Sequence, residues 1–361
     1  PPRSTLFPYT TLFRSSDIFS VRLTTDADLS VTPASASNAA YHIFLKFAFL
    51  EAKKDFGPVS FSLAGGMIET PVLGYINKIS DYRWIAQNYL QQSRTIINNQ
   101  VIDNIADIGI RASFGIFKYV TLTGSFTNGG GYKAQETNSH KAFTYMLSIT
   151  PVKDLHLFGY GRNEITAKYD YLGKKAKREY YGYGVAYSSD LIKIGIAHAF
   201  PSIQTVGVAS EFNATWQFAG EDIYIYPVQK RGYMIVDSWL HFSLGAVVPT
   251  VPLIVTGRFV YGIQRGTYQK FLTEDECGKQ RESILYGVGL GWKFNKNVRI
   301  LVGFELQRYF VKKNRVLRYA EDPAGGTDYF NGAAFGIGDV YVGSRNPHDA
   351  RRVYIKTEVK F

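Results

Sequence analysis

Apolar and polar residues alternate with a period of two along almost the whole chain, and this pattern constrains the fold more than any other feature of the sequence. The C-terminal segment RVYIKTEVKF is a clear example, because alternate residues are apolar or neutral, most of the others are charged, and the segment ends at Phe361. Such alternation predicts β-strands with one apolar and one polar face. About sixteen such segments follow one another, most of them close to the nine to eleven residues that a tilted strand needs to cross a bilayer.

The connections between these segments alternate in length. Short connections, such as residues 188–190 (SSD) and 295–297 (NKN), are followed by long ones, such as residues 308–350 and 66–106. Transmembrane β-barrels have this asymmetry, with short periplasmic turns at one end and long outer loops at the other. The order of short and long connections agrees with such a barrel from one end of the chain to the other.

A membrane helix is not expected, because no segment has the run of about 18 apolar residues that a spanning helix needs. Sixteen strands also exceed the seven to nine of a usual sandwich. Within a membrane every backbone N–H and C=O must be paired, so a sheet has to close on itself. The sequence therefore predicts an all-β fold, an antiparallel transmembrane β-barrel in the bacterial outer membrane, with apolar side chains toward the lipid and polar side chains toward the interior.

The first fifteen residues differ in kind from the rest. Residues 5–15 read TLFPYTTLFRS, and a back-translation of this string resembles a common short-read sequencing adapter. Segments of this kind are set aside before the fold is considered. We therefore treat residues 1–15 as non-native, residues 16–361 as one barrel domain, and the native start with any signal peptide as replaced.

The chain is basic, with 41 Lys and Arg against 30 Asp and Glu and a formal net charge of +11. Nucleic-acid binding is not expected, because the basic residues are dispersed over the strands and not collected in a patch with stacking aromatics. Basic rings inside a pore favour anions, although acidic residues on the same faces, such as Asp237 and Glu305, should neutralise part of this charge. The residues expected to line the pore are Arg22, Lys46, Arg111, Lys193, Arg258, Lys293, Arg299 and Lys356.

The long connection at residues 66–106 carries tyrosines between its charges, and two interpretations stay open for it. It could fold into the barrel and narrow the pore with facing charges, selecting solutes by size and field. It could instead cap the barrel or pack on a neighbouring subunit. The charged residues in question are Glu69, Lys78, Asp81, Arg83 and Arg94.

Several strings, in this order, resemble the phosphate-selective porin-like family of bacterial outer-membrane channels. They are FSVRL at Phe19, FLKFAFLE at Phe44, GGMIETPVLGYINKISDYRW from Gly65, ADIGIRASF at Ala106, NGGGY at Asn128 and TGRFVYG at Thr256. The resemblance implies that the strand at Phe19 is the third of about eighteen in the intact protein, and that residues 66–106 are the third outer loop. It also implies a possible homotrimer. The closing strand resembles those of other outer-membrane barrels, which implies recognition by the barrel-assembly machinery through the segment that ends at Phe361.

The expected function is passive diffusion of small hydrophilic, anionic solutes, with no cofactor, no metal and no enzymatic activity. Phosphate specificity is not predicted, because no dense ladder of arginines lies on consecutive strands. The alternatives are a barrel that acts as a sheath or receptor for a protein partner, and an outer-membrane hydrolase. The only constellation that favours a hydrolase is Asp237, His241 and Ser243, but four residues along a strand span about 13 Å, too far for a direct bond between the first two.

Cys277 is the only cysteine, so no internal disulfide can form, and an incidental loop thiol is favoured over a nucleophile. The acidic run before it could bind a divalent cation at the outer surface, but a solvated loop is the favoured interpretation.

Overall fold

The computed structural model describes most of the chain as antiparallel β-sheet with one α-helix. The described residues are 10–14, 17–30, 40–82, 85, 88–91, 102–132, 141–169, 175–206, 215–218, 221–224, 228–248, 250–268, 280–295, 298–313, 316–318, 340–341 and 349–359. No helix in this part of the chain is long and apolar enough to cross a membrane.

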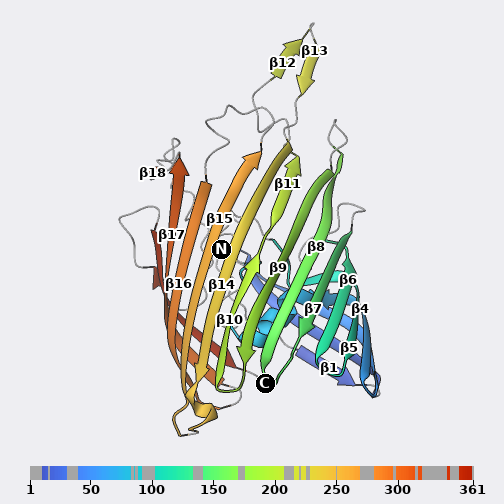
Figure 1. Cartoon of the computed structure of the whole chain (residues 1–361), viewed down its shortest axis with the longest axis vertical. Coiled ribbons are helices and arrows are strands. Elements are labelled where there is room, and N and C mark those ends of the chain that lie inside the picture. Colours follow the sequence, from blue (N-terminus) through green and yellow to red (C-terminus); the bar gives the residue numbers. More distant parts are fainter. Residues whose placement is uncertain are drawn as a thin grey trace.

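Fourteen antiparallel strand positions form the wall of a barrel, which confirms the fold class predicted from the alternation (Figure 1). Each strand pairs with its neighbours in the sequence, and β10 and β11 share one position because both pair with β9 and β14. The wall strands are β2 (Phe19–Ser30), β3 (Ala40–Phe56), β4 (Val59–Glu69), β5 (Ala106–Ile116), β6 (Val120–Thr127), β7 (Ala142–Ile149), β8 (Leu155–Tyr169), β9 (Lys175–Ser188), β10 (Ile192–Ala199), β11 (Ser202–Val206), β14 (Val228–Ser243), β15 (Leu253–Tyr268), β16 (Gln280–Lys293), β17 (Val298–Lys313) and β20 (Asp349–Val359).

Two of the sixteen expected strands are not part of the wall. The segments expected to cross the membrane between residues 206 and 226 contribute β12 (Thr215–Phe218) and β13 (Glu221–Tyr224), which pair only with each other as a separate sheet. This hairpin lies beyond the ends of the wall strands (Figure 1). Alternation shows that a strand has two unlike faces but not which sheet it joins. Because these two strands are both absent from the wall, the number of wall strands falls by an even number and the order of short and long connections is preserved.

The two ends of the sheet are bordered by short strands. The adapter-like segment contributes one of them, β1 (Thr10–Arg14), which pairs antiparallel with β2. At the other end β20 pairs with β17 along its whole length, and the short β18 (Val316–Arg318) and β19 (Val340–Tyr341) flank these strands. No pairing joins β20 to β1 or β2 among the described strands, and Phe361 lies outside the described residues.

The outer face of the wall is apolar and exposed. On β16, Val288 and Leu290 are 60% and 58% exposed, whereas the neighbouring Gly289 points inward. On the closing strand, Ile355 is exposed and Tyr354 is fully buried inside, as the alternation predicted. In a monomeric soluble protein, an apolar surface that encircles the molecule would be exceptional, but it is the surface that lipid requires.

The helix α1 (Pro71–Ser80) lies inside the barrel, where it contacts β6, β7, β9, β10 and β14 (Figure 1). Its first helical residue is Pro71, a position where the missing N–H and the restricted φ of proline favour a helix start. The helix ends at Ser80, and the next residue, Asp81, has a left-handed φ of 49°, a conformation that Asp and Asn tolerate better than most residues. A single 3-10 turn (Leu244–Ala246) is the other helical element in the described residues.

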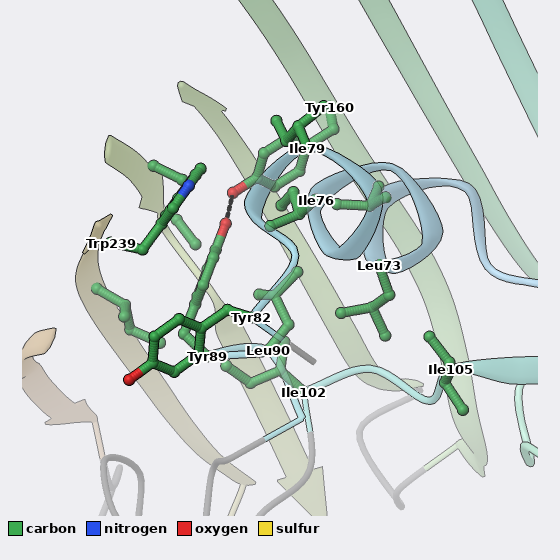
Figure 2. Close-up of a cluster of buried hydrophobic side chains, with 14 of the residues drawn as sticks. Leu73, Ile76, Ile79, Tyr82, Tyr89, Leu90, Ile102, Ile105, Tyr160 and Trp239 are labelled. Carbon is green, nitrogen blue, oxygen red and sulfur yellow. Dashed lines mark hydrogen bonds between the residues drawn. The ribbon is translucent and has the colours of Figure 1, made fainter. Parts of the chain in front are cut away.

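The hydrophobic core lies between this loop and the inner wall. Leu73, Ile76 and Ile79 of α1 are buried, and they belong to one cluster with Tyr160 and Trp239 of the wall (Figure 2). The inner face of the wall is therefore not uniformly polar. Its aromatic and aliphatic side chains cover the loop and leave the charged side chains of the wall to line the rest of the interior.

Candidate pore constriction

The described part of the 66–106 connection, with the helix α1, lies inside the barrel, as the first of the two interpretations requires. The Tyr75 hydroxyl lies 3.0 Å from His156 Nδ1 of β8, and the hydroxyls of Tyr89 and Tyr160 form a hydrogen bond (Figure 2). Burial raises the pKa of Tyr89 well above its usual value, so this phenol stays neutral and adds no charge to the interior. The loop residues Arg83 and Arg94 lie outside the described residues.

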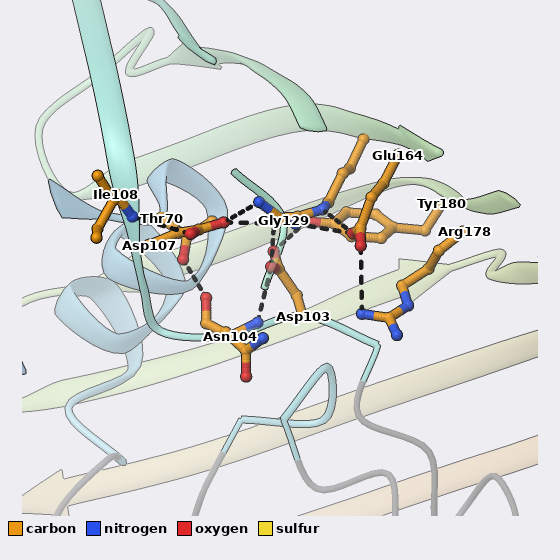
Figure 3. Close-up of polar contacts among 10 residues, drawn as sticks. Thr70, Asp103, Asn104, Asp107, Ile108, Gly129, Glu164, Arg178 and Tyr180 are labelled. Atoms are coloured by element: carbon orange, nitrogen blue, oxygen red, sulfur yellow. Dashed lines mark hydrogen bonds and ion pairs between the residues drawn. The ribbon is translucent and has the colours of Figure 1, made fainter. Parts of the chain in front are cut away.

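A buried ionic network anchors the C-terminal end of the loop to β8 and β9 (Figure 3). Arg162 donates hydrogen bonds to Asp103 Oδ1 at 2.7 Å and to Glu164 Oε2 at 2.8 Å, and its side chain is 1% exposed. Tyr180 also donates a hydrogen bond to Asp103. Burial raises the pKa of Asp103, and the Arg162 guanidinium opposes this shift because it favours the charged carboxylate. We refer to this set as the Arg162 anchor.

A second anchor joins the loop to the opposite side of the wall. Arg299 of β17 donates two hydrogen bonds to the Asp81 carboxylate, at 2.8 and 3.0 Å. His241 Nε2 of β14 lies 3.9 Å from the same carboxylate. Tyr82 follows Asp81 in the sequence, and the centroid of its ring lies 5.4 Å from the Arg258 guanidinium carbon. The loop is thus attached to strands on both sides of the barrel.

A β-bulge in β3 turns two phenylalanines toward the interior. The register between β2 and β3 shifts at Thr24, so that Lys46 is the extra residue. Before the bulge, alternate apolar residues of β3 are exposed on the outer face. After the bulge, Phe47 and Phe49 are buried inside the barrel. The alternation of apolar and polar residues alone would place both on the lipid face. A bulge adds one residue to one strand and therefore exchanges the two faces from that point onward.

The bulge gives two arginines aromatic supports. The Arg22 guanidinium lies 4.3 Å from the centroid of the Phe47 ring, and the Arg111 guanidinium lies 5.6 Å from that of Phe49. Both arginine side chains remain partly exposed, at 29% and 16%. They form, with the Glu69 carboxylate at 3.6 Å from Arg22, a charged inner surface on β2 to β5.

Five of the eight basic residues expected to line the pore are paired with carboxylates. Neutralisation by acidic residues was expected for part of this charge, and it extends further than the sequence indicated. The Arg258–Asp237 pair is almost fully buried, so it contributes little to the field in an open lumen. The pairs are Arg22–Glu69 (3.6 Å), Lys46–Asp26 (3.0 Å), Arg111–Glu51 (3.2 Å), Arg258–Asp237 (2.8 Å) and Arg299–Asp81 (2.8 Å).

The remaining three basic residues lie near the ends of their strands at the short-turn rim. Lys193 Nζ lies 3.1 Å from the Ser188 hydroxyl, Lys293 is exposed, and Lys356 Nζ lies 5.9 Å from the centroid of the Tyr354 ring. Among the described residues, neither Lys193 nor Lys293 has a carboxylate partner. Lys78, in the last turn of α1, is close enough to His156 to act on it electrostatically. Lys193 and Lys293 therefore place positive charge without a carboxylate partner, among the described residues, at this rim.

The structure does not assemble a catalytic constellation from Asp237, His241 and Ser243. The Asp237 carboxylate accepts hydrogen bonds from Arg258, and His241 Nε2 faces the Asp81 carboxylate and not Asp237. No group of three or more metal-binding side chains occurs within the described part of the chain. The nearest described carboxylate to His241 thus belongs to the loop.

The Arg162 anchor was missed at the sequence level, although part of its signal was present. Arg162 and Glu164 continue the inward-facing alternation of His156 on β8, so an inner charged pair could have been inferred there. Asp103 lies 59 residues away from Arg162 in a connection without periodicity, and no sequence pattern links the two.

No protein-family model and no curated protein matches the sequence. Among solved structures, a loop-deletion variant of OmpT, an outer membrane protein of Vibrio cholerae, is similar with a TM-score of 0.53 and 8% identity, over 97% of this chain and 88% of that one. OmpF of Salmonella typhi in complex with daunomycin has a TM-score of 0.53 and 10% identity, over 97% and 88%. A trimer form of Vibrio cholerae OmpT has a TM-score of 0.51 and 10% identity, over 97% and 89%. The shared architecture and the apolar outer face place the chain among the β-barrels of the bacterial outer membrane.

Proposed function

We propose that the chain is a passive diffusion pore for small hydrophilic solutes, with a preference for anions. The observation that carries the proposal is a loop held inside the barrel by anchors on both sides and facing a partly exposed charged wall. A pore narrowed in this way selects solutes by size and by the field across the constriction. Transport along a gradient breaks no bond, so the proposal requires no cofactor.

The preference for anions is supported by the unpaired lysines and not by the total charge. Most of the basic residues expected in the lumen are neutralised by adjacent carboxylates, and such pairs have a small net field. Lys193 and Lys293 lack such partners among the described residues, and they lie where the pore opens at the short-turn rim. Phosphate selectivity is not part of the proposal, because the sequence shows no dense ladder of arginines on consecutive strands.

The proposal extends to a homotrimer in outer-membrane lipid, because one similar structure is a trimer form of OmpT. Assembly in the membrane would use β20, the last strand, as the element presented to the barrel-assembly machinery. Cross-linking of the folded protein in detergent tests the trimer. A single band at the monomer mass would contradict it.

The function is tested by single-channel recording of the full chain in planar bilayers under a potassium chloride gradient. Steady conductance with a reversal potential toward that of chloride is the expected result. Lys193→Gln should reduce the chloride preference, whereas Lys153→Gln, an exposed lysine in a short turn, should not. A folded, heat-modifiable barrel without conductance would refute the open pore and favour the sheath, receptor or hydrolase alternatives.

A further inference from the structure

Four basic or imidazole side chains from four different strands converge at the short-turn end of the inner wall. Lys193 of β10 is directly paired in register with His241 of β14, and Lys293 of β16 is directly paired with Arg299 of β17. Both lysines and Arg299 are close enough to His241 to act on its imidazole electrostatically. The Asp81 carboxylate lies 2.8 Å from the Arg299 guanidinium and 3.9 Å from His241 Nε2.

The Asp81 carboxylate is bound by this cluster as a ligand would be. Arg299 donates one hydrogen bond to each of its oxygens, at 2.8 and 3.0 Å, which is the two-pronged geometry that guanidinium groups adopt with carboxylates. The Asp81 side chain nevertheless remains 35% exposed, although Arg299 and His241 are largely buried. A solute can therefore reach the site from the interior of the barrel.

His241 supplies a second indication that the cluster is built for a ligand. Its side chain is 5% exposed, and its Nδ1 has no hydrogen-bond partner among the described residues. A buried polar atom without a partner costs free energy unless something else satisfies it. The imidazole, two unpaired lysines and a two-pronged arginine are together more than one aspartate side chain requires.

We propose that Lys193, His241, Lys293 and Arg299 form a binding site for a solute carboxylate, and that Asp81 of the loop occupies this site until such a solute displaces it. The inference rests on the proposed function, since it names the substrate class of the same pore. Asp81 competes efficiently because its attachment to the loop gives it a high effective concentration at the site. A dicarboxylate can engage Arg299 with one end and the lysines with the other, an advantage that a single chloride ion does not have.

Displacement of Asp81 would release only the segment of the loop that directly follows α1. The Arg162 anchor and the Tyr89–Tyr160 hydrogen bond hold the rest of the loop on β8 and β9. The occupied site would therefore loosen the constriction locally and leave the barrel folded. The carboxylate solute would in this way widen its own passage.

The experiment is titration calorimetry of the full chain, folded in detergent at fixed ionic strength, with succinate as the probe and neutral succinamide as its control. Asp81→Asn removes the competing carboxylate, and Asn tolerates the left-handed conformation at this position. It should bind succinate about tenfold more tightly, the order of one charge-assisted hydrogen bond. Asp190→Asn makes the same charge change at an exposed position in a neighbouring short turn and should leave the affinity unchanged.

Arg299→Lys keeps the charge but loses the two-pronged geometry, and should weaken succinate binding about tenfold. Lys193→Gln breaks no ion pair, so it tests the site even if the Arg299 variant fails to fold. A purely structural Asp81–Arg299 pair would make the two variants change in the same direction, and this result would overturn the proposal. So would equal binding of succinamide. If the chain conducts chloride but binds no succinate, the binding site is refuted and the pore is not. If the variants change succinate binding as expected but the chain does not conduct, the pore is refuted and the binding site is not.

Discussion

Replacement of Arg162 by methionine should destabilise the folded barrel by about 3 kcal/mol. The guanidinium is 1% exposed and donates hydrogen bonds to Asp103 and Glu164, which are 0% and 6% exposed at their side chains. Methionine keeps the length of the side chain and removes its charge, so two buried carboxylates lose their main partner. Breaking a buried ion pair from one side costs about 3–5 kcal/mol. The lower end applies here because Tyr180 still donates to Asp103 and Arg178 lies 3.8 Å from Glu164.

The assay is urea unfolding of the protein in lipid vesicles, followed by the shift between the folded and unfolded bands on an unheated gel. Arg178→Met is the matched control, since its contact with Glu164 is longer and its side chain is 26% exposed, and it should cost under about 1 kcal/mol. The double variant Arg162→Met with Asp103→Asn should recover part of the loss, because the orphaned charge is removed. A loss for Arg162→Met no larger than that of the control would refute the Arg162 anchor as the main attachment of the loop.

Three further outcomes follow from the wall and the lumen. Gly303→Ala places a methyl group in steric conflict with the Tyr354 ring of β20 and should lower the free energy of unfolding by about 1–3 kcal/mol. Gly65→Ala, whose added methyl group would have its nearest neighbour at 4.0 Å, should be close to neutral in the same unfolding assay. Equal losses for the two variants would contradict the inward packing of Gly303. Val302→Arg introduces a charge on the exposed apolar face of β17 and should lower the free energy of unfolding by about 2–4 kcal/mol if the residue lies near the bilayer midplane. An unchanged unfolding midpoint would show that this face does not contact lipid. Glu51→Gln frees Arg111 from its carboxylate partner at 3.2 Å and should move the reversal potential further toward that of chloride; a shift toward potassium would oppose the proposed role of this pair in the lumen.

The candidate site was predictable only in outline. The inward position of basic residues such as Lys193 follows from strand periodicity, but their charge balance does not. Arg299 pairs with Asp81 across 218 residues, and Arg162 pairs with Asp103 across 59. Neither distance has a pattern in the sequence, because a carboxylate in a connection without periodicity gives no sign of the strand that it will reach.

The sequence by itself determined the class of the fold and the two faces of its strands. Period-two alternation follows from the pleat of a single strand, so it can be recognised without knowledge of any partner. Tertiary structure decided three things that depend on contacts between distant residues: the separate β12–β13 hairpin, the bulge at Lys46 that turned Phe47 and Phe49 inward, and the path of the loop through the barrel. Each depends on contacts between residues that are far apart in the sequence, and these contacts exist only once the strands have assembled into the sheet.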